Sequence, residues 1–438
     1  MVNNLNSMVA DGEMTGRYLV LFREDAIAAG IEMLSEVATI DVSGAEATAA
    51  DTPILLSTLG VAVVNAEPEQ IRSLRVSDQD DSPILAIEPE RVVYALQDPP
   101  ELLGQKLPQS LDYLKTYRGA VNHIDYLKGY RDAVNHLVDS LIPTEQTQLS
   151  QASVDESVVT WGLQATNVVN SCMSGRGIKV AVLDTGFDFN HPDFIGRSII
   201  SKSFISGEDV QDGNGHGTHC IGTACGTRTP SVLPRYGIAY NSEIYVGKVL
   251  SNQGSGSDGG ILQGIEWALA NECHVISMSL GAPTQVGTRF SPVYEAVAQR
   301  ALRRGTLIIA AAGNESRRDL GTINPVARPA NCPSIVAVGA LDSQLQVALF
   351  SNRGINPDGG QIDIAGPGVA VYSSWLMPRK YRTISGTSMA TPHVAGIAAL
   401  HAEATGVRGE ELWNLLMRTA RRLSLSSEDV GAGLVQSP

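Results

Sequence analysis

The sequence predicts an α/β fold in its second half, preceded by a smaller α+β domain. From residue 158 onward, short β-branched and aliphatic runs alternate with helical stretches. The strand candidates are apolar throughout rather than alternating, which is typical of strands buried on both faces. Together these two observations predict a parallel sheet covered by helices on both faces.

The predicted elements divide the chain into four parts. Residues 1–15 form a polar tail, residues 16–96 the α+β domain, residues 97–157 a linker and residues 158–438 the α/β domain. In the α+β domain we expect strands or extended segments at 17–23, 53–65 and 84–96 and helices at 26–37 and 67–75. In the α/β domain we expect strands at 178–183, 244–250, 274–279, 306–312, 335–340 and 361–365, and helices at 216–226, 258–271, 291–304, 389–403 and 408–422.

Composition excludes several classes of function. The 438 residues include 46 acidic and 32 basic side chains, which disfavours nucleic acid as a partner. No apolar run reaches the roughly 18 residues of a membrane span. The first residues lack the basic and apolar regions of a secretory signal, and the odd number of five cysteines implies no disulfide framework. We therefore expect a monomer in the cytoplasm, with secretion as the alternative if a signal has been lost.

The linker contains a short duplication. Residues 112–123 return at residues 125–136 with a period of 13 and ten of twelve positions identical. Two copies are too few for a solenoid. A metal site formed by His123 and His136 is less favoured than helical packing, and the duplication carries no chemical assignment.

Polar residues follow the predicted strands at the places where α/β folds bind ligands. Asp184 follows the strand candidate 178–183, His216 opens a helix within a glycine-rich segment, and Ser388 directly precedes the apolar helix 389–403. A serine hydroxyl becomes nucleophilic when an imidazole takes its proton and a carboxylate orients the imidazole. Asn314 also follows a strand, and its amide could bind an oxyanion together with the Ser388 N–H.

Each motif has a plainer interpretation when taken alone. Ser388 could open an ordinary capped helix. Asp184-Thr185-Gly186 also occurs in turns and in aspartic peptidases, although those need a second such loop, and Asn314 could be a turn residue. His216 and His219 could bind a metal, but the other motifs would then have no role. The order Asp, His, Asn, Ser within one chain favours nucleophilic catalysis.

These motifs resemble those of the subtilisin-like serine peptidases, the subtilases, from about residue 161 to 435. The matching segments are 182–186, 216–220, 312–314 and 386–393. Subtilisin is itself a standard example of this triad order and of an asparagine in the oxyanion hole. The resemblance implies that Asp184 orients His216, His216 is the general acid and base, Ser388 is the nucleophile and Asn314 binds the oxyanion.

The resemblance implies a serine endopeptidase that hydrolyses proteins or peptides and needs no cofactor for its chemistry. Two alternatives are a processing peptidase dedicated to one partner and a catalytically silent scaffold. Two backbone segments would flank a bound peptide as extra strands. They are Gly254, Ser255 and Gly256, and Ser279, Leu280 and Gly281. Ala311 and Gly313 would line the first specificity pocket and Ala327 its floor, which leaves room for a large apolar group.

Two further features follow from the resemblance. Cys220, directly after His219, is similar to the free cysteine of the proteinase K-like branch and implies sensitivity to mercurials. Structural calcium is implied at Asp193, although residues 226–236 lack the family's partner loop. A second calcium site is implied at Pro333, Ile335 and Asp363, which would supply two carbonyls and a carboxylate.

The α+β domain resembles a subtilase propeptide, chiefly at residues 16–20 and 87–96. The resemblance implies an intramolecular inhibitor and folding aid whose end lies in the cleft like a product. Leu96 would then occupy the first specificity pocket, and the chain would cut itself between Leu96 and Gln97. The linker departs from the family, whose mature chain starts close to the catalytic domain.

Overall fold

A computed structural model describes residues 13–38, 52–75, 82–96 and 155–438. These residues belong to one compact unit. The duplicated segment 112–136 and Gln97 lie outside the described residues. No helix of the described part of the chain is long and apolar enough to cross a membrane.

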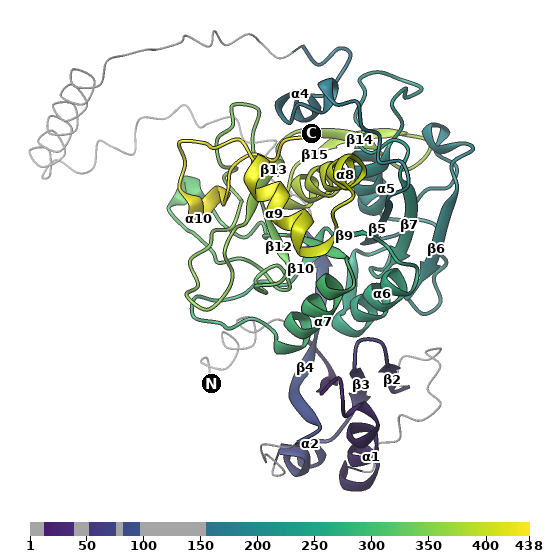
Figure 1. Cartoon of the computed structure of the whole chain (residues 1–438), viewed down its shortest axis with the longest axis vertical. Coiled ribbons are helices and arrows are strands. Elements are labelled where there is room, and N and C mark those ends of the chain that lie inside the picture. The colour runs from purple at the N-terminus through teal and green to yellow at the C-terminus, as the bar shows by residue number, and fades with distance from the viewer. Residues whose placement is uncertain (1–12, 39–51, 76–81, 97–154) are drawn as a thin grey trace, which may run out of the picture. The chain divides into compact units, whose positions relative to one another are not determined.

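A seven-stranded parallel sheet forms the centre of the α/β domain (Figure 1). Its strands, in spatial order, are β13 (Ile364–Pro367), β12 (Val336–Leu341), β11 (Leu307–Ala311), β9 (Val275–Met278), β5 (Lys179–Asp184), β7 (Glu243–Lys248) and β6 (Ile199–Ser203). Every neighbouring pair is parallel. The fold class expected from the alternating pattern is therefore confirmed.

Helices cover both faces of this sheet. One face carries α5 (His216–Cys225), α8 (Thr387–Thr405) and α9 (Gly409–Thr419), and the other carries α6 (Asp258–Ala270) and α7 (Pro292–Arg303). Successive residues of a strand alternate between the two cores, so that Val180 and Val182 face α8 whereas Ala181 and Leu183 face α6. This double burial is why the strands lack an apolar–polar alternation.

The α+β domain contains an antiparallel sheet. Its elements are β1 (Met14–Phe22), α1 (Ile27–Ala38), β2 (Ile54–Leu56), β3 (Val61–Asn65), α2 (Pro68–Arg75) and β4 (Ile84–Ala95). One side of this sheet buries Val20 and Phe22 in a core that also contains Leu34 of α1. The other side shares a core with α6 and α7 of the α/β domain, to which Leu21 and Val93 belong. Full burial of such a side chain stabilises the folded state by roughly 1.5–3 kcal/mol.

Short elements complete the described fold. They are α4 (Trp161–Ala165), η2 (Val168–Asn170), η3 (Pro192–Phe194), β8 (Ser255–Ser257), β10 (Leu280–Gly281), η4 (Arg318–Leu320), β14 (Val371–Ser374), β15 (Tyr381–Ile384) and α10 (Ser427–Val430). The pattern of apolar residues did not predict β6, which is an edge strand with an exposed face. It also joined β2 and β3 into one segment, although a turn at residues 57–60 separates them.

Candidate active site

Asp184 and His216 meet where β5 ends and α5 begins. The Asp184 Oδ1 atom lies 2.8 Å from His216 Nδ1, and both side chains are buried. Burial lowers the pKa of His216, but the interactions with Asp184 and Cys220 together outweigh burial and raise the pKa well above its ordinary value. His216 Nε2 has no hydrogen-bond partner among the described residues. Asp184 thus fixes the imidazole through Nδ1, and Nε2 is available to accept a proton.

Ser388 is the second residue of α8, beside the same pair. Its hydroxyl donates to the Ser279 carbonyl at 3.0 Å, and the Ser279 hydroxyl donates to the Ser388 carbonyl at 2.8 Å. The Cys220 thiol donates to the Ser388 carbonyl at 3.6 Å and lies 3.9 Å from His216 Nδ1. In this state the serine hydroxyl is turned toward Ser279, and its hydrogen bond to the imidazole is not formed.

The side-chain amide of Asn314 follows β11 and is fixed in orientation. Its Oδ1 atom accepts hydrogen bonds from the N–H and the hydroxyl of Thr387, both at 2.9 Å. The Nδ2 group therefore points away from Thr387, and it donates to the Leu96 carbonyl oxygen at 2.9 Å. The amide thus binds a carbonyl oxygen that lies one residue from the end of β4.

The end of β4 lies between two strands of the α/β domain. Val92, Val93 and Tyr94 pair with β8, opposite Ser257, Gly256 and Ser255. On the other side, Tyr94 and Ala95 pair with Gly281 and Leu280 of β10. Both pairings are antiparallel, and Ala95 N–H also donates to the Gly254 carbonyl at 2.8 Å. The segment is bound mainly through its backbone.

Small residues surround the Leu96 side chain, which is 7% exposed. A Cβ atom at Gly281 would lie 3.5 Å from Leu96 Cδ1 and equally close to the Ala327 Cβ. Gly313 faces Ala327 as well, since a Cβ there would lie 3.0 Å from it, and Gly313 has a φ of +108° that disfavours other residues. Ala311, also expected in this wall, ends β11 and is buried.

Comparisons with known proteins agree with this geometry. A model of the subtilase family matches residues 175–433. Subtilisin Savinase of Lederbergia lenta is 42% identical over 285 residues, which cover 64% of this chain and 97% of the relative. The chain belongs to the subtilase family. Subtilisin E of Bacillus subtilis is 43% identical over an alignment that covers 52% of this chain and 56% of the relative. An alkaline protease of Alkalihalobacillus alcalophilus is 42% identical over an alignment that covers 64% of this chain and 69% of the relative.

Sequence reasoning missed several residues that hold this subtilase site together. Thr387 orients Asn314, and Ser279 binds the Ser388 hydroxyl. The buried carboxylate of Asp212 accepts hydrogen bonds from Gly215 N–H, Thr218 N–H and the Thr185 hydroxyl, which ties the end of β5 to the start of α5. An aspartate shortly before a helix is a capping signal and could have indicated Asp212.

The five cysteines of the subtilase are all free thiols. Cys220 is buried between His216 and α8, and burial raises its pKa. A protonated thiol in this place packs as a small apolar group. Membership of the proteinase K-like branch stays a prediction.

The structure around Asp193 does not fit the calcium site that the family resemblance implied. Ser231 N–H donates to Oδ1 at 2.7 Å, and the hydroxyls of Tyr236 and Tyr381 donate to Oδ2 at 2.7 and 3.0 Å. Burial raises the pKa of Asp193, but these donors outweigh burial and lower it. Hydrogen-bond donors thus stabilise the ionised carboxylate and occupy both of its oxygens, in the place of a cation.

Tyr236→Phe is expected to lower the free energy of unfolding by about 1–3 kcal/mol, because it removes a donor from a buried charge. Urea unfolding of the mature protein would measure this loss. If these donors rather than calcium stabilise Asp193, a chelator should cause no loss of unfolding free energy that depends on this residue. A stability loss on chelation that Asp193→Asn abolishes would instead indicate calcium there.

The residues of the second implied calcium site lie at one edge of the sheet. Pro333 and Ile335 precede β12, and Asp363 precedes the neighbouring strand β13. The Asp363 Oδ2 atom accepts a hydrogen bond from Ala337 N–H at 2.8 Å, and burial raises the pKa of Asp363 to about 7. A carboxylate is a ligand that calcium accepts, and calcium at this site stays a prediction.

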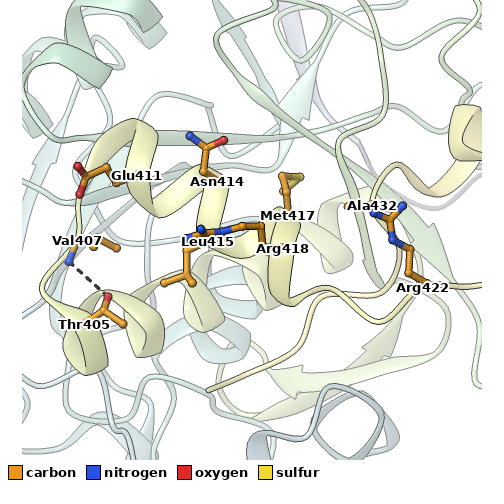
Figure 2. A pocket seen from close by; sticks show the side chains of 9 residues that line it. All are labelled: Thr405, Val407, Glu411, Asn414, Leu415, Met417, Arg418, Arg422 and Ala432. Carbon is orange, nitrogen blue, oxygen red and sulfur yellow. Dashed lines mark hydrogen bonds between the residues drawn. The ribbon is translucent and has the colours of Figure 1, made fainter.

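A surface hollow between the end of α8 and α9 lies apart from the active site (Figure 2). It is lined by Thr405, Val407, Glu411, Asn414, Leu415, Met417, Arg418, Arg422 and Ala432. None of the predicted catalytic or peptide-binding residues borders this hollow, so it gives no reason to revise their assignment.

Proposed function

We propose that this subtilase is an active serine endopeptidase made as a zymogen that cleaves itself after Leu96. One observation carries the proposal: the Leu96 carbonyl accepts a hydrogen bond from Asn314 Nδ2 at 2.9 Å, at the end of a strand paired on both sides. A carbonyl held by an oxyanion-hole donor and followed by Gln97 is in the place of a scissile peptide group. The buried Asp184–His216 pair lies beside Ser388 in the same site.

Ser388 would attack the carbonyl carbon of the peptide bond while His216 takes the hydroxyl proton through Nε2. This requires the hydroxyl to rotate from the Ser279 carbonyl toward the imidazole. His216 would then give the proton to the leaving amine, which leaves an acyl group on Ser388. Water would attack this ester, again with His216 as the base, and release the carboxylate and the free serine. Asp184 would hold the tautomer and stabilise the imidazolium.

The α+β domain would act as an intramolecular inhibitor after cleavage. The Leu96 side chain fills the first pocket, and β4 occupies both backbone segments that a substrate would use. Contacts remote from the cleft add to this attachment, including the ion pairs of Glu24 with Arg300 and Arg303. A segment bound in this way blocks the site until it is removed.

A fluorophosphonate probe and mass spectrometry together test this proposal. We expect the probe to label Ser388 in the matured protein and the mass of the fragments to place the cut between Leu96 and Gln97. Casein hydrolysis would separate a general endopeptidase from a peptidase dedicated to one partner. A chain that stays unlabelled and intact would be a silent scaffold, and a cut at another bond would move the processing site.

Asn314→Ala is expected to lower kcat by about 10²–10³-fold with little change in KM, a magnitude measured for the corresponding asparagine of a subtilisin. The amide would bind the oxyanion of the transition state more strongly than the ground-state carbonyl. Steady-state kinetics with a chromogenic peptide measures the loss. An equal rise in KM at constant kcat would contradict this role.

Substrates with a large apolar residue before the scissile bond should be preferred. Gly281, Gly313 and Ala327 leave the space that Leu96 fills. Peptides with Phe or Leu there should react faster than those with Asp or Lys. Equal kcat/KM values across such a series would contradict the assignment of the pocket.

Calcium at Pro333, Ile335 and Asp363 is proposed as a structural component that takes no part in the chemistry. Isothermal titration with calcium and an Asp363→Asn variant would test it. The cytoplasmic location and the monomeric state stay predictions, and secretion is compatible with the similarity to the subtilisins.

A further inference from the structure

A buried pair of opposite charges borders β4 upstream of the active site. Asp258 is the first residue of α6, and Arg328 follows Ala327 in the segment before β12. Their side chains are 0% and 6% exposed, and Arg328 Nη2 lies 3.1 Å from Asp258 Oδ2. Both belong to the α/β domain, so the pair does not depend on the α+β domain. Neither residue has a role in the proposed reaction.

Asp258 contacts the backbone of the strand that ends at Leu96. Its Oδ2 atom accepts a hydrogen bond from Arg91 N–H at 2.9 Å, and its Oδ1 atom accepts one from the Tyr294 hydroxyl at 3.1 Å. Arg91 is the sixth residue before the Leu96–Gln97 bond. Every residue except proline offers this N–H. The contact therefore reads the backbone and disfavours proline at that position.

Arg328 contacts a side chain of the same strand. Its Nη2 atom lies 3.0 Å from Glu88 Oε1, and the Ser291 hydroxyl also donates to this oxygen. The guanidinium lies over the Tyr294 ring, 5.2 Å from its centroid. Ser291 caps the start of α7, where backbone N–H groups favour an anion. Glu88, the ninth residue before the bond, is thus bound by a cation, a hydroxyl and a helix start.

When β4 leaves the cleft, Arg328 loses one of its two carboxylate partners. Arg328 keeps Asp258, but it loses the carboxylate of Glu88, which is 14% exposed in the complex. An acidic side chain restores the charge-assisted contact, whereas a lysine would face a buried cation. Glu90 differs from Glu88 in that it has no charged partner from the α/β domain among its hydrogen bonds to the described residues. It binds Arg17 of the α+β domain, and its contact with the α/β domain is Gly259 N–H.

We propose that Asp258 and Arg328 form an upstream subsite that selects substrates with an acidic side chain nine residues before the scissile bond. The subsite rests on the proposed peptidase function and on substrates that follow the path of β4. It extends substrate recognition from the small-residue pocket of Leu96 to a second, charged contact. Selection by both contacts would restrict cleavage to exposed extended segments with an acidic residue at this spacing.

Quenched-fluorescent peptides test the subsite on the matured protein, from which the α+β domain has been removed. The parent peptide carries residues 88–96 before the cut, and matched peptides carry Glu88→Gln, Glu88→Lys or, as the control, Glu90→Gln. We expect Glu88→Gln to lower kcat/KM about tenfold, mainly through KM, and Glu88→Lys to lower it further. Glu90→Gln should change it less than threefold. Equal kcat/KM for the parent and the Glu88→Gln peptide would overturn the proposal.

Enzyme variants assign the effect to Arg328. Arg328→Gln should cleave the parent and the Glu88→Gln peptide equally well, whereas Arg303→Gln, an exposed arginine of the same surface, should keep the difference. An Arg328→Gln enzyme that still discriminates would overturn the assignment. If this variant does not fold, the peptide comparison on the unaltered enzyme decides. A shorter peptide with residues 92–96 before the cut that is not cleaved at all would overturn the proposed function itself.

Discussion

A chain in which Ser388 is replaced by alanine is expected to stay intact at the Leu96–Gln97 bond. Its hydrolysis of peptides should fall by about 10⁶-fold, the size of the effect in a subtilisin that lacks its serine. The reason is that no acyl-enzyme can form without the hydroxyl, while Asn314 and the backbone segments still bind the peptide. Mass spectrometry of the purified chain and a peptide assay measure the two losses.

Ser279→Ala is the matched control for this variant. Like Ser388→Ala, this substitution removes a hydroxyl from the contact between Ser279 and Ser388. Each of the two substitutions removes one hydrogen bond worth about 1 kcal/mol. Both chains should therefore fold, which circular dichroism would check. The control should still process itself, because its carbonyl and the Ser388 hydroxyl remain. Cleavage after Leu96 in the Ser388→Ala chain would mean that another peptidase makes this cut.

The parallel sheet was predictable because its strands are buried on both faces. Runs such as 178–183 and 306–312 are apolar at consecutive positions, and β5 and β11 begin and end within a residue or two of them. The edge strand β6 was missed, because three of its five residues are exposed and leave no apolar pattern. Burial on both faces, rather than strand propensity, decided which strands the sequence indicated.

The residues of the candidate site were predictable where their motifs are local, and unpredictable where contacts join distant segments. Asp184, His216, Asn314 and Ser388 each stand in a short motif after a strand or before a helix. The donors around Asp193 come instead from residues 38 to 188 positions away, so the sequence indicated a metal ligand where the structure has hydroxyl and amide donors. Arg328 and Glu88 lie 240 positions apart, and no local pattern connects them.

The pH dependence of the reaction provides the second test of large effect. His216 can accept the serine proton only in its neutral form. Because Asp184 and Cys220 together outweigh burial and raise the pKa of His216 well above 6.5, the rate should rise with pH through this raised pKa. The folding free energy has the opposite dependence. The stabilisation from protonated His216 is complete below the unfolded pKa and is lost as pH rises through the folded pKa.

Asp184→Asn is expected to lower kcat by about 10⁴-fold and to move the acidic limb of the pH–rate profile to lower pH. The amide cannot hold the imidazole in the tautomer that leaves Nε2 free, which accounts for the loss of rate. It also removes the charge that opposes burial, so the pKa of His216 should fall. Asp188→Asn is the control, because this carboxylate binds Gln211 and Met377 N–H near the site without contacting the imidazole. An acidic limb that moves equally in both variants would show that general electrostatics, rather than the Asp184–His216 contact, sets the pKa of the base.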